Sequence, residues 1–355
     1  MSDMSETAER ADVVAAPGGP QRGNGASELL RRAGTLFLQQ REASVLLIAV
    51  AIFLYFTAST PSFFGHGSFV NIAQYMAPYT IIAIGEVLLM VCGEIDLSVG
   101  YVWMLSPFVM RGFIDSGVPE LLAIIITVLL LSLIGLVNGI ITTWFGVPSL
   151  ITTLGMGYLI FGVALTVSSA QQVNLPDGNG GVGRWFGAAA WSEFIWATVL
   201  VLIFHVILTR TRWGLYTVSV GGNLLGARES GIKVNTIKIG NFMITSSLGA
   251  LAGILEAFKN DIIDPSAGQL AVVLVALAGA VIGGTAMLGG SGTMIGAWLG
   301  VLVLGILQDG FNLRGISANK FQIILGAAIL LAMIANTYLT RLRGAGRIAA
   351  RARTH

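Results

Sequence analysis

The chain has 355 residues, of which 55% are hydrophobic and 11% are charged. Soluble domains carry about a quarter charged residues, so this composition excludes a soluble globular protein and indicates an integral membrane protein. The net charge is only +2, and no soluble domain is present to carry a basic face, which excludes nucleic-acid binding. The single cysteine, Cys92, excludes an intrachain disulfide.

Residues 1–43 form the first predicted region, a disordered or amphipathic cytoplasmic tail. The first 33 residues are rich in Ser, Gly, Ala, Pro and charged side chains, and they bury too little apolar surface to fold. The tail is too long and too acidic at its start for a secretory signal, so we expect the first apolar run to be retained.

The next region, residues 44–340, is predicted to be an all-α polytopic bundle with about ten transmembrane helices. A helix needs about 20 apolar residues to cross a bilayer. The candidate spans are residues 44–60, 70–91, 97–114, 121–141, 149–168, 193–209, 238–258, 267–283, 292–309 and 320–340. An even number places both termini on one side. Lys and Arg cluster before residue 43, over 210–238 and in the basic tail 341–355, which indicates that this side is the cytoplasm.

Three carboxylates interrupt the apolar sequence around the second and third spans. Glu86, Glu94 and Asp96 lie within eleven residues, and a charge at the bilayer centre costs roughly 3 kcal/mol on insertion scales. One interpretation is a translocation path formed by Glu94, Asp96 and Asn138. The other is a helix break in which Asp96 caps a helix that begins at Leu97. For Asp96 we favour the cap.

Glycine is abundant, with 46 residues, and four pairs have the GxxxG spacing: Gly135 and Gly139, Gly249 and Gly253, Gly279 and Gly283, and Gly296 and Gly300. Small residues at this spacing let helix backbones approach closely within a bilayer. We assign these pairs to helix packing rather than to solute contact.

Residues 171–191 form the longest loop on the predicted outer side, and Pro-Asp-Gly and Gly-Gly within it are turn signals. A small set of outer charges has two interpretations, a docking surface for an external protein or ordinary solvated loop residues. The set comprises Asp177, Arg184, Lys259, Asp261 and Asp264.

Residues 214–232 form the longest polar interruption within the apolar chain. Asn223 is predicted to cap a helix of about two turns from Leu224 to Ser230, and Gly231 is predicted to end it in the left-handed conformation. The positive charges around it indicate a cytoplasmic position. Such a helix is either a surface on which another protein acts or an ordinary connecting loop.

Enzymatic motifs are absent from the sequence. Neither HExxH nor GxSxG occurs, and one Cys with three scattered His gives no metal-ligand spacing. The glycine-rich residues 283–291 lack the lysine of a phosphate-binding loop, because Gly290 stands in its place. We therefore expect no catalytic, metal or nucleotide site in this chain.

Three stretches in order resemble one family. GGNLLGARESGIKV (residues 221–234), VCGEIDLSVG (91–100) and VIGGTAMLGGSGTMIGAWLGVLVLGILQDGFNLRGIS (281–317) are similar to motifs of the permease subunits of bacterial ABC importers of the ribose/xylose/arabinose class. The similarity extends from about Ile48 to Tyr338. It implies a multi-pass protein of the cytoplasmic membrane that forms a path for a monosaccharide, a sugar alcohol or a similar small polar solute.

The resemblance also implies partners. These are a cytoplasmic ATPase that holds ATP and Mg, an extracytoplasmic sugar-binding protein and a second permease copy, identical or not. The loop 210–237 would couple to the ATPase through Gly222, Asn223, Leu224, Leu225, Ala227, Arg228, Glu229, Ser230, Gly231 and Ile232.

Two positions depart from the family pattern. Glu94 stands where the family often has glycine, and residues 269–274, directly after Gly268, lack the acidic residue that the family commonly has there. Two rival interpretations remain open at this point. A secondary transporter or channel without an ATPase explains the spans and the carboxylates, and a structural membrane scaffold explains the glycine-packed faces.

Overall fold

The computed structural model describes residues 41–175, 180–317, 319–331 and 334. Its elements in chain order are α2 Arg41–Ser59, α3 His66–Val91, α4 Val99–Asp115, α5 Glu120–Trp144, α6 Ser149–Ser168, β1 Val173–Asn174, α7 Gly181–Gly183, η1 Arg184–Ala188, α8 Ser192–Arg210, α9 Arg212–Gly222, α10 Leu224–Glu229, α11 Val234–Asn260, β2 Ile262–Ile263, α12 Gln269–Ile282 and α13 Met294–Leu313. A further apolar helix covers Asn319–Leu331. Most of the predicted tails, residues 1–40 and 341–355, lie outside the described residues.

The expected all-α polytopic membrane protein is confirmed. Within the described part of the chain, seven helices are long and apolar enough to cross a membrane: α2, α3, α5, α6, α8, α11 and α13. Helices α4 and α12 coincide with predicted spans but have only 17 and 14 residues. Each of the ten predicted segments therefore contains a helix, although not every one has the length of a full crossing.

Helices α3 and α11 form the centre of the bundle. Helix α11 packs along α5, α3 and α4, and α3 also contacts α8, α12 and α13. Most of α3 is buried inside the protein, whereas α5, α6 and α8 keep many large apolar side chains on the outside, among them Leu129, Leu159 and Leu202. Helices that are apolar on all sides belong in lipid, so these helices form the membrane-facing layer.

The GxxxG pairs are confirmed as packing faces. A Cβ at Gly135 would lie 2.2 Å from the Phe242 carbonyl oxygen on α11, and one at Gly253 would lie 1.9 Å from the Trp103 carbonyl oxygen on α4. A Cβ at Gly300 of α13 would lie 2.0 Å from the Gly279 carbonyl oxygen of α12. The backbones of these helices touch at the glycines, as small-residue packing in a bilayer requires.

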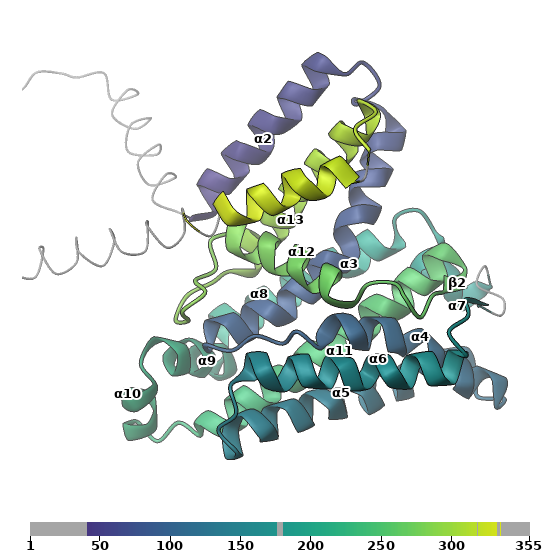
Figure 1. Ribbon diagram of the computed structural model, residues 1–355. Coiled ribbons are helices and arrows are strands. Elements are labelled where there is room, and N and C mark those ends of the chain that lie inside the picture. Colours follow the sequence, from purple (N-terminus) through teal and green to yellow (C-terminus); the bar gives the residue numbers. More distant parts are fainter. Residues whose placement is uncertain (1–40, 176–179, 318, 332–333, 335–355) are drawn as a thin grey trace, which may run out of the picture. The chain divides into compact units, whose positions relative to one another are not determined.

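The bundle has two distinct ends (Figure 1). Helices α9 and α10 lie at one of them, which we call the α10 end. At the opposite β2 end, β1 pairs with β2 in antiparallel register, with Val173 opposite Ile263 and Asn174 opposite Ile262. This pair ties the residues after α6 to the end of α11, and the periodicity of the sequence gave no sign of it.

Candidate functional site

The predicted capped helix at residues 224–230 is present as α10. The Asn223 side-chain oxygen accepts a hydrogen bond from the Gly226 amide at 3.0 Å, and Gly231 follows with a φ of 79°. Both capping predictions are confirmed, and the helix ends at Glu229. The preceding residues 212–222, read from the sequence as loop, form helix α9, whose first turn is capped by the Thr211 hydroxyl.

Helix α10 is anchored by one side chain and exposes most of the others. Ala227 is buried in a cluster with Val220 of α9, Leu89 of α3 and Ile237 of α11. Leu225 is 67% exposed, and Arg228 and Glu229 are also exposed. A short rigid helix with an apolar residue and charges on its free face has the form of a contact surface for another protein.

Three backbone segments meet directly beside α10. The Gly290 amide, in the loop between α12 and α13, donates to the carbonyl oxygen of Val91, the last residue of α3, at 2.8 Å. A Cβ at Gly221 of α9 would lie only 1.8 Å from that same oxygen. The sequence placed Gly221 in the polar stretch 214–232 and Gly290 in the glycine-rich stretch 283–291 without predicting that they meet, although the two Gly-Gly pairs that contain them were a possible signal of close contact.

Asp96 forms a buried polar turn just before α4. Its Oδ1 accepts from the Ser98 amide at 2.8 Å and from the Ser98 hydroxyl at 2.6 Å. Asn138 of α5 donates through Nδ2 to Ser98 Oγ at 2.8 Å and to Asp96 Oδ2 at 3.5 Å. Helix α4 begins at Val99, two residues later than predicted. Asp96 therefore caps the turn before the helix rather than a helix that begins at Leu97.

Helix α6 supplies hydroxyl groups to the same break in the chain. The Leu97 amide donates to Thr153 Oγ1 at 3.0 Å, and the Ile95 amide donates to Ser149 Oγ at 3.4 Å. Non-helical backbone at membrane depth is tolerated only where protein groups or water satisfy its polar atoms. The two hydroxyl groups of α6 meet this requirement for the Ile95 and Leu97 amides.

The two remaining carboxylates of this region have different partners. Glu86 is fully buried, and its Oε2 accepts from the Asp96 amide at 3.4 Å. Glu94 forms an ion pair with Lys238 near the start of α11, and both side chains are largely buried. The structure thus brings Asp96 and Asn138 together and directs Glu94 toward Lys238, so the predicted trio is not one cluster.

The residues predicted for receptor docking gather around the β2 end, but several of them are engaged within the chain. Lys259 Nζ lies 2.7 Å from Glu256 Oε2 and 3.3 Å from Glu193 Oε2. Asp264 accepts from Gln172 Nε2 at 2.8 Å. Asp261 follows α11 in the left-handed conformation, and Arg184 is exposed on η1. Asp177 lies outside the described residues, and a docking role for the set stays a prediction.

Several neighbouring cavities lie among α3, α4, α11, α12 and α13, and sequence reasoning missed them; three of them are named A, B and C. Cavity A, of about 260 Å³, is lined by Trp103, Met104, Gln172, Glu256, Asn260 and Asp264 among others. Cavity B, of about 200 Å³, is lined by Gln74, Tyr75, Tyr79, Trp103, Glu256 and Lys259 among others. Cavity C, of about 300 Å³, is lined by Asn71, Gln74, Tyr75, Lys259, Gln308 and Asp309 among others.

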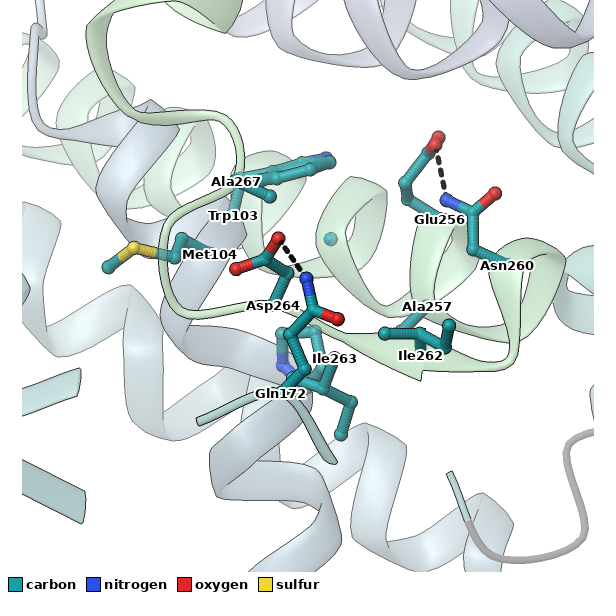
Figure 2. A pocket seen from close by; sticks show the side chains of 12 residues that line it. Trp103, Met104, Gln172, Glu256, Ala257, Asn260, Ile262, Ile263, Asp264 and Ala267 are labelled. Atoms are coloured by element: carbon teal, nitrogen blue, oxygen red, sulfur yellow. Dashed lines mark hydrogen bonds between the residues drawn. The ribbon is translucent and has the colours of Figure 1, made fainter. Parts of the chain in front are cut away.

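Figure 2 shows cavity A, with Trp103, Asp264 and Glu256 on different sides of the same space. Glu256 accepts a hydrogen bond from Asn260 Nδ2 at 2.8 Å, and the Gln172–Asp264 bond lies across from it. The lining residues come from α4, α11 and the segment around β2, which are far apart in the sequence. Only the folded bundle brings them together.

Apolar helices packed through glycine, a buried polar break, polar cavities between the helices and a capped helix exposed at one end together define a membrane transport protein. Comparison with known proteins identifies the family. Residues 68–333 match the family described as branched-chain amino acid transport system / permease component, and the chain belongs to this family. It is the permease subunit of an ABC importer, a multi-pass membrane protein and not itself a catalyst.

Related proteins extend over most of the chain. The xylose/arabinose import permease protein of Sulfolobus acidocaldarius is 37% identical over 310 residues, which cover 84% of this chain and 86% of the relative. The ribose import permease protein of Escherichia coli K12 is 33% identical over 302 residues, which cover 84% and 93%. The autoinducer 2 import system permease protein of Photorhabdus luminescens is 29% identical over 304 residues, which cover 84% and 90%. No solved structure matches the chain.

Family membership decides among the interpretations that the sequence left open. An importer permease works with an ATPase and a binding protein, so the secondary transporter, the channel without an ATPase and the structural scaffold are set aside. The resemblance carried by residues 91–100, 221–234 and 281–317 is confirmed.

Proposed function

We propose that this permease subunit carries a neutral monosaccharide or sugar alcohol into the cell. The relatives named for xylose/arabinose and for ribose support a sugar as the solute. The low charge of the membrane helices agrees with a neutral solute. ATP and Mg would be held by the ATPase, a binding protein would deliver the sugar from outside, and a second permease copy would complete the path.

The observation that carries the coupling role is the exposed, capped helix α10. The buried residue of α10, Ala227, packs in one cluster with residues of α3, α9 and α11. A displacement of α10 by the ATPase would therefore also move these helices. The contact of Gly221 with Val91 and Gly290 extends this route to the loop before α13. We assign residues 222–232 to the ATPase interface on this basis.

Transport requires that the two ends of the path open in turn. ATP shifts the balance only if the ATPase with ATP bound favours one conformation of the permease over the other, and the loaded binding protein must likewise discriminate between the two. Helix pairs that touch through glycine backbones, such as α12 and α13, are suited to small sliding movements between these states.

The first prediction concerns the charge on α10. Arg228→Glu is expected to weaken binding of the ATPase by at least about tenfold, because a carboxylate would replace a cation at a charged interface. Uptake is then lost while membrane insertion is retained, and copurification of the ATPase together with radiolabelled sugar uptake measures both effects.

The matched control is Arg212→Glu, which makes the same charge change on an exposed residue at the start of α9, outside α10. This variant is expected to keep the ATPase and transport. Normal uptake by Arg228→Glu would show that α10 is not part of the ATPase interface.

The second prediction concerns orientation. We propose ten crossings with both termini and the α10 end in the cytoplasm and the β2 end outside. Ser116 and Ser230 form a matched pair, because each is exposed, directly follows a helix and returns its hydroxyl to a carbonyl oxygen four residues earlier. Each is replaced by cysteine in a Cys92→Ala background.

In cells that express the permease without its ATPase, a membrane-impermeant maleimide is expected to label Ser116→Cys in sealed cells and to label Ser230→Cys only after the membrane is opened. Labelling of Ser230→Cys in sealed cells would reverse the proposed orientation.

A further inference from the structure

Cavities A, B and C form one row, because adjacent members share side chains. Trp103 and Glu256 line both A and B, and Gln74, Tyr75 and Lys259 line both B and C. The row therefore passes between α4 and α11, continues along α3 and reaches α13. The volumes of about 260, 200 and 300 Å³ lie at or below the low end of roughly 300–1,000 Å³ found for drug-sized ligands. The row suits a small solute.

Trp103 lines both of the first two cavities, and one glycine packs against its ring while another packs against its backbone. A Cβ at Gly268 would lie 2.4 Å from the Trp103 ring, and a Cβ at Gly253 would meet the Trp103 carbonyl oxygen at 1.9 Å. Gly268 also has a φ of 75°, which side chains rarely adopt. Gly268 thus makes room for the indole ring, and Gly253 lets the backbone of α11 approach the backbone of α4 at the same residue.

Several polar atoms along the row are buried without a partner in the described residues. They are Nε1 of Trp103, Oε1 of Gln308 and Oδ2 of Asp309. Asp309 is only 4% exposed, and its other oxygen accepts from Asn71 at 3.2 Å. A buried donor or acceptor without a partner is costly, and such groups are expected where a ligand or water completes the bonding. One donor and two acceptors fit hydroxyl groups, which both donate and accept.

The charges along the row indicate which solutes fit. Among the described lining residues of A, B and C, Lys259 is the only cation, and it already pairs with Glu256 and Glu193. Glu256, Asp264 and Asp309 add negative charge. Anionic sugar phosphates need an excess of Arg or Lys. The tryptophan and tyrosine rings instead offer flat apolar faces with negative π-electron density, which attract the weakly positive C–H groups of a sugar ring.

We propose that this row is a solute-binding site in the path, where a neutral polyhydroxylated ring packs against Trp103 and Tyr75 and bonds to Trp103 Nε1, Gln308 and Asp309. This inference rests on the proposed function, since it assigns the residues of this chain that hold the imported sugar. None of the residues predicted for the path from the sequence, Glu94, Asp96 and Asn138, lines the row.

The test uses the complete importer, with its ATPase and binding protein, in proteoliposomes. Trp103→Phe removes the indole N–H and keeps an aromatic ring beside Gly268, and Gln308→Met removes the acceptor at nearly constant volume. Trp298→Phe is the matched control, because Trp298 Nε1 is also buried without a partner in the described residues but Trp298 lines none of the three cavities. The probes are radiolabelled D-xylose, L-arabinose, D-ribose and ribitol, with ribose 5-phosphate as the anionic competitor.

The measured quantity is sugar transported per ATP hydrolysed. Each cavity variant is expected to lower this ratio about fivefold through the loss of one hydrogen bond to the solute, while ATPase stimulation by the loaded binding protein and complex assembly stay normal. The control is expected to keep the ratio of the unmodified complex, and ribose 5-phosphate is expected not to compete.

The outcomes separate the site from the function on which it rests. If the unmodified complex carries none of the four probes, the proposed solute class fails, and the site fails with it. If the complex carries a probe and both cavity variants keep its ratio, the site alone is overturned. Equal losses in Trp298→Phe and the cavity variants would also overturn it, because the effect would then belong to buried tryptophan in general.

Discussion

Gly221→Ala is expected to abolish uptake and to reduce the yield of folded protein severely, whereas Gly222→Ala is expected to match the unmodified chain in yield of folded protein and in thermal unfolding midpoint. The added methyl group at position 221 would lie 1.8 Å from the Val91 carbonyl oxygen and 2.9 Å from the Gly290 amide nitrogen. Because both neighbours are backbone atoms, relief requires that α3, α9 or the loop before α13 move. The Gly290–Val91 hydrogen bond would be broken, and the cost falls in the exceptional range above about 4 kcal/mol.

Gly222 is the matched control because it is the next residue of the same helix. A Cβ there would find its nearest neighbour, the Gly290 Cα, at 3.8 Å, an ordinary contact. Alanine also favours the helix over glycine, so the free energy of unfolding changes by less than about 1 kcal/mol. The yield of monodisperse protein, its thermal unfolding midpoint and sugar uptake are measured for both variants. Equal behaviour of the two variants would show that the junction beside α10 is not tightly packed.

The sequence was sufficient for features that local chemistry determines. Each of the ten apolar runs that were predicted to be spans contains a helix in the structure. The Asn223 cap and the left-handed Gly231 were predicted from neighbouring residues. The GxxxG spacing identified packing faces, because close helix contact in lipid requires small residues. In each case the residues that decide the structure lie within a few positions of one another.

Features that join distant segments were not predictable in the same way. Glu94 pairs with Lys238, 144 positions away, and Arg314 at the end of α13 contacts Thr60 after α2, 254 positions away. Trp103 was an unremarked residue of an apolar run, and its place between cavities A and B depends on Gly253 and Gly268 of other elements. Such contacts follow from topology, and a single sequence contains no periodic signal for them.

The second large effect is expected at Asp96. Asp96→Ala removes the acceptor for the Ser98 amide and hydroxyl and for the Asn138 side chain, in a place with no exposure to solvent. Each buried donor left without a partner costs about 1–3 kcal/mol. We therefore expect this variant to lose several kcal/mol of stability in total, and with it most of the folded protein and its transport.

Asp96→Asn is expected to retain more of the folded protein and of its transport than Asp96→Ala does. The introduced amide oxygen accepts from the Ser98 amide, as the carboxylate does. The introduced NH₂ group needs an acceptor, and a flip of the Asn138 amide turns its Oδ1, which has no partner in the described residues, toward position 96. The flip leaves the Asn138 NH₂ group without a partner, so this variant is expected to lose about 1–3 kcal/mol, less than Asp96→Ala. Ser98 then donates its hydroxyl hydrogen to Asn138 Oδ1, which has replaced Asn138 Nδ2 beside it. Asp96→Ser keeps an acceptor for the turn and is expected to fall between the two.

A double-variant cycle tests whether the cluster acts as a unit. If Asp96 and Asn138 stabilise the break in the chain together, Asp96→Ala combined with Asn138→Ala costs less than the sum of the single changes, because the donor of Asn138 is removed with its acceptor. Thermal unfolding midpoints in detergent and uptake at matched expression measure the cycle. If Asp96→Asn folds normally but transports nothing, the negative charge itself serves transport, and the assignment of Asp96 to capping is wrong. Normal transport by Asp96→Asn leaves the carboxylate with a structural role, in which it orders the start of α4 so that Trp103, one turn further along, faces its two glycines.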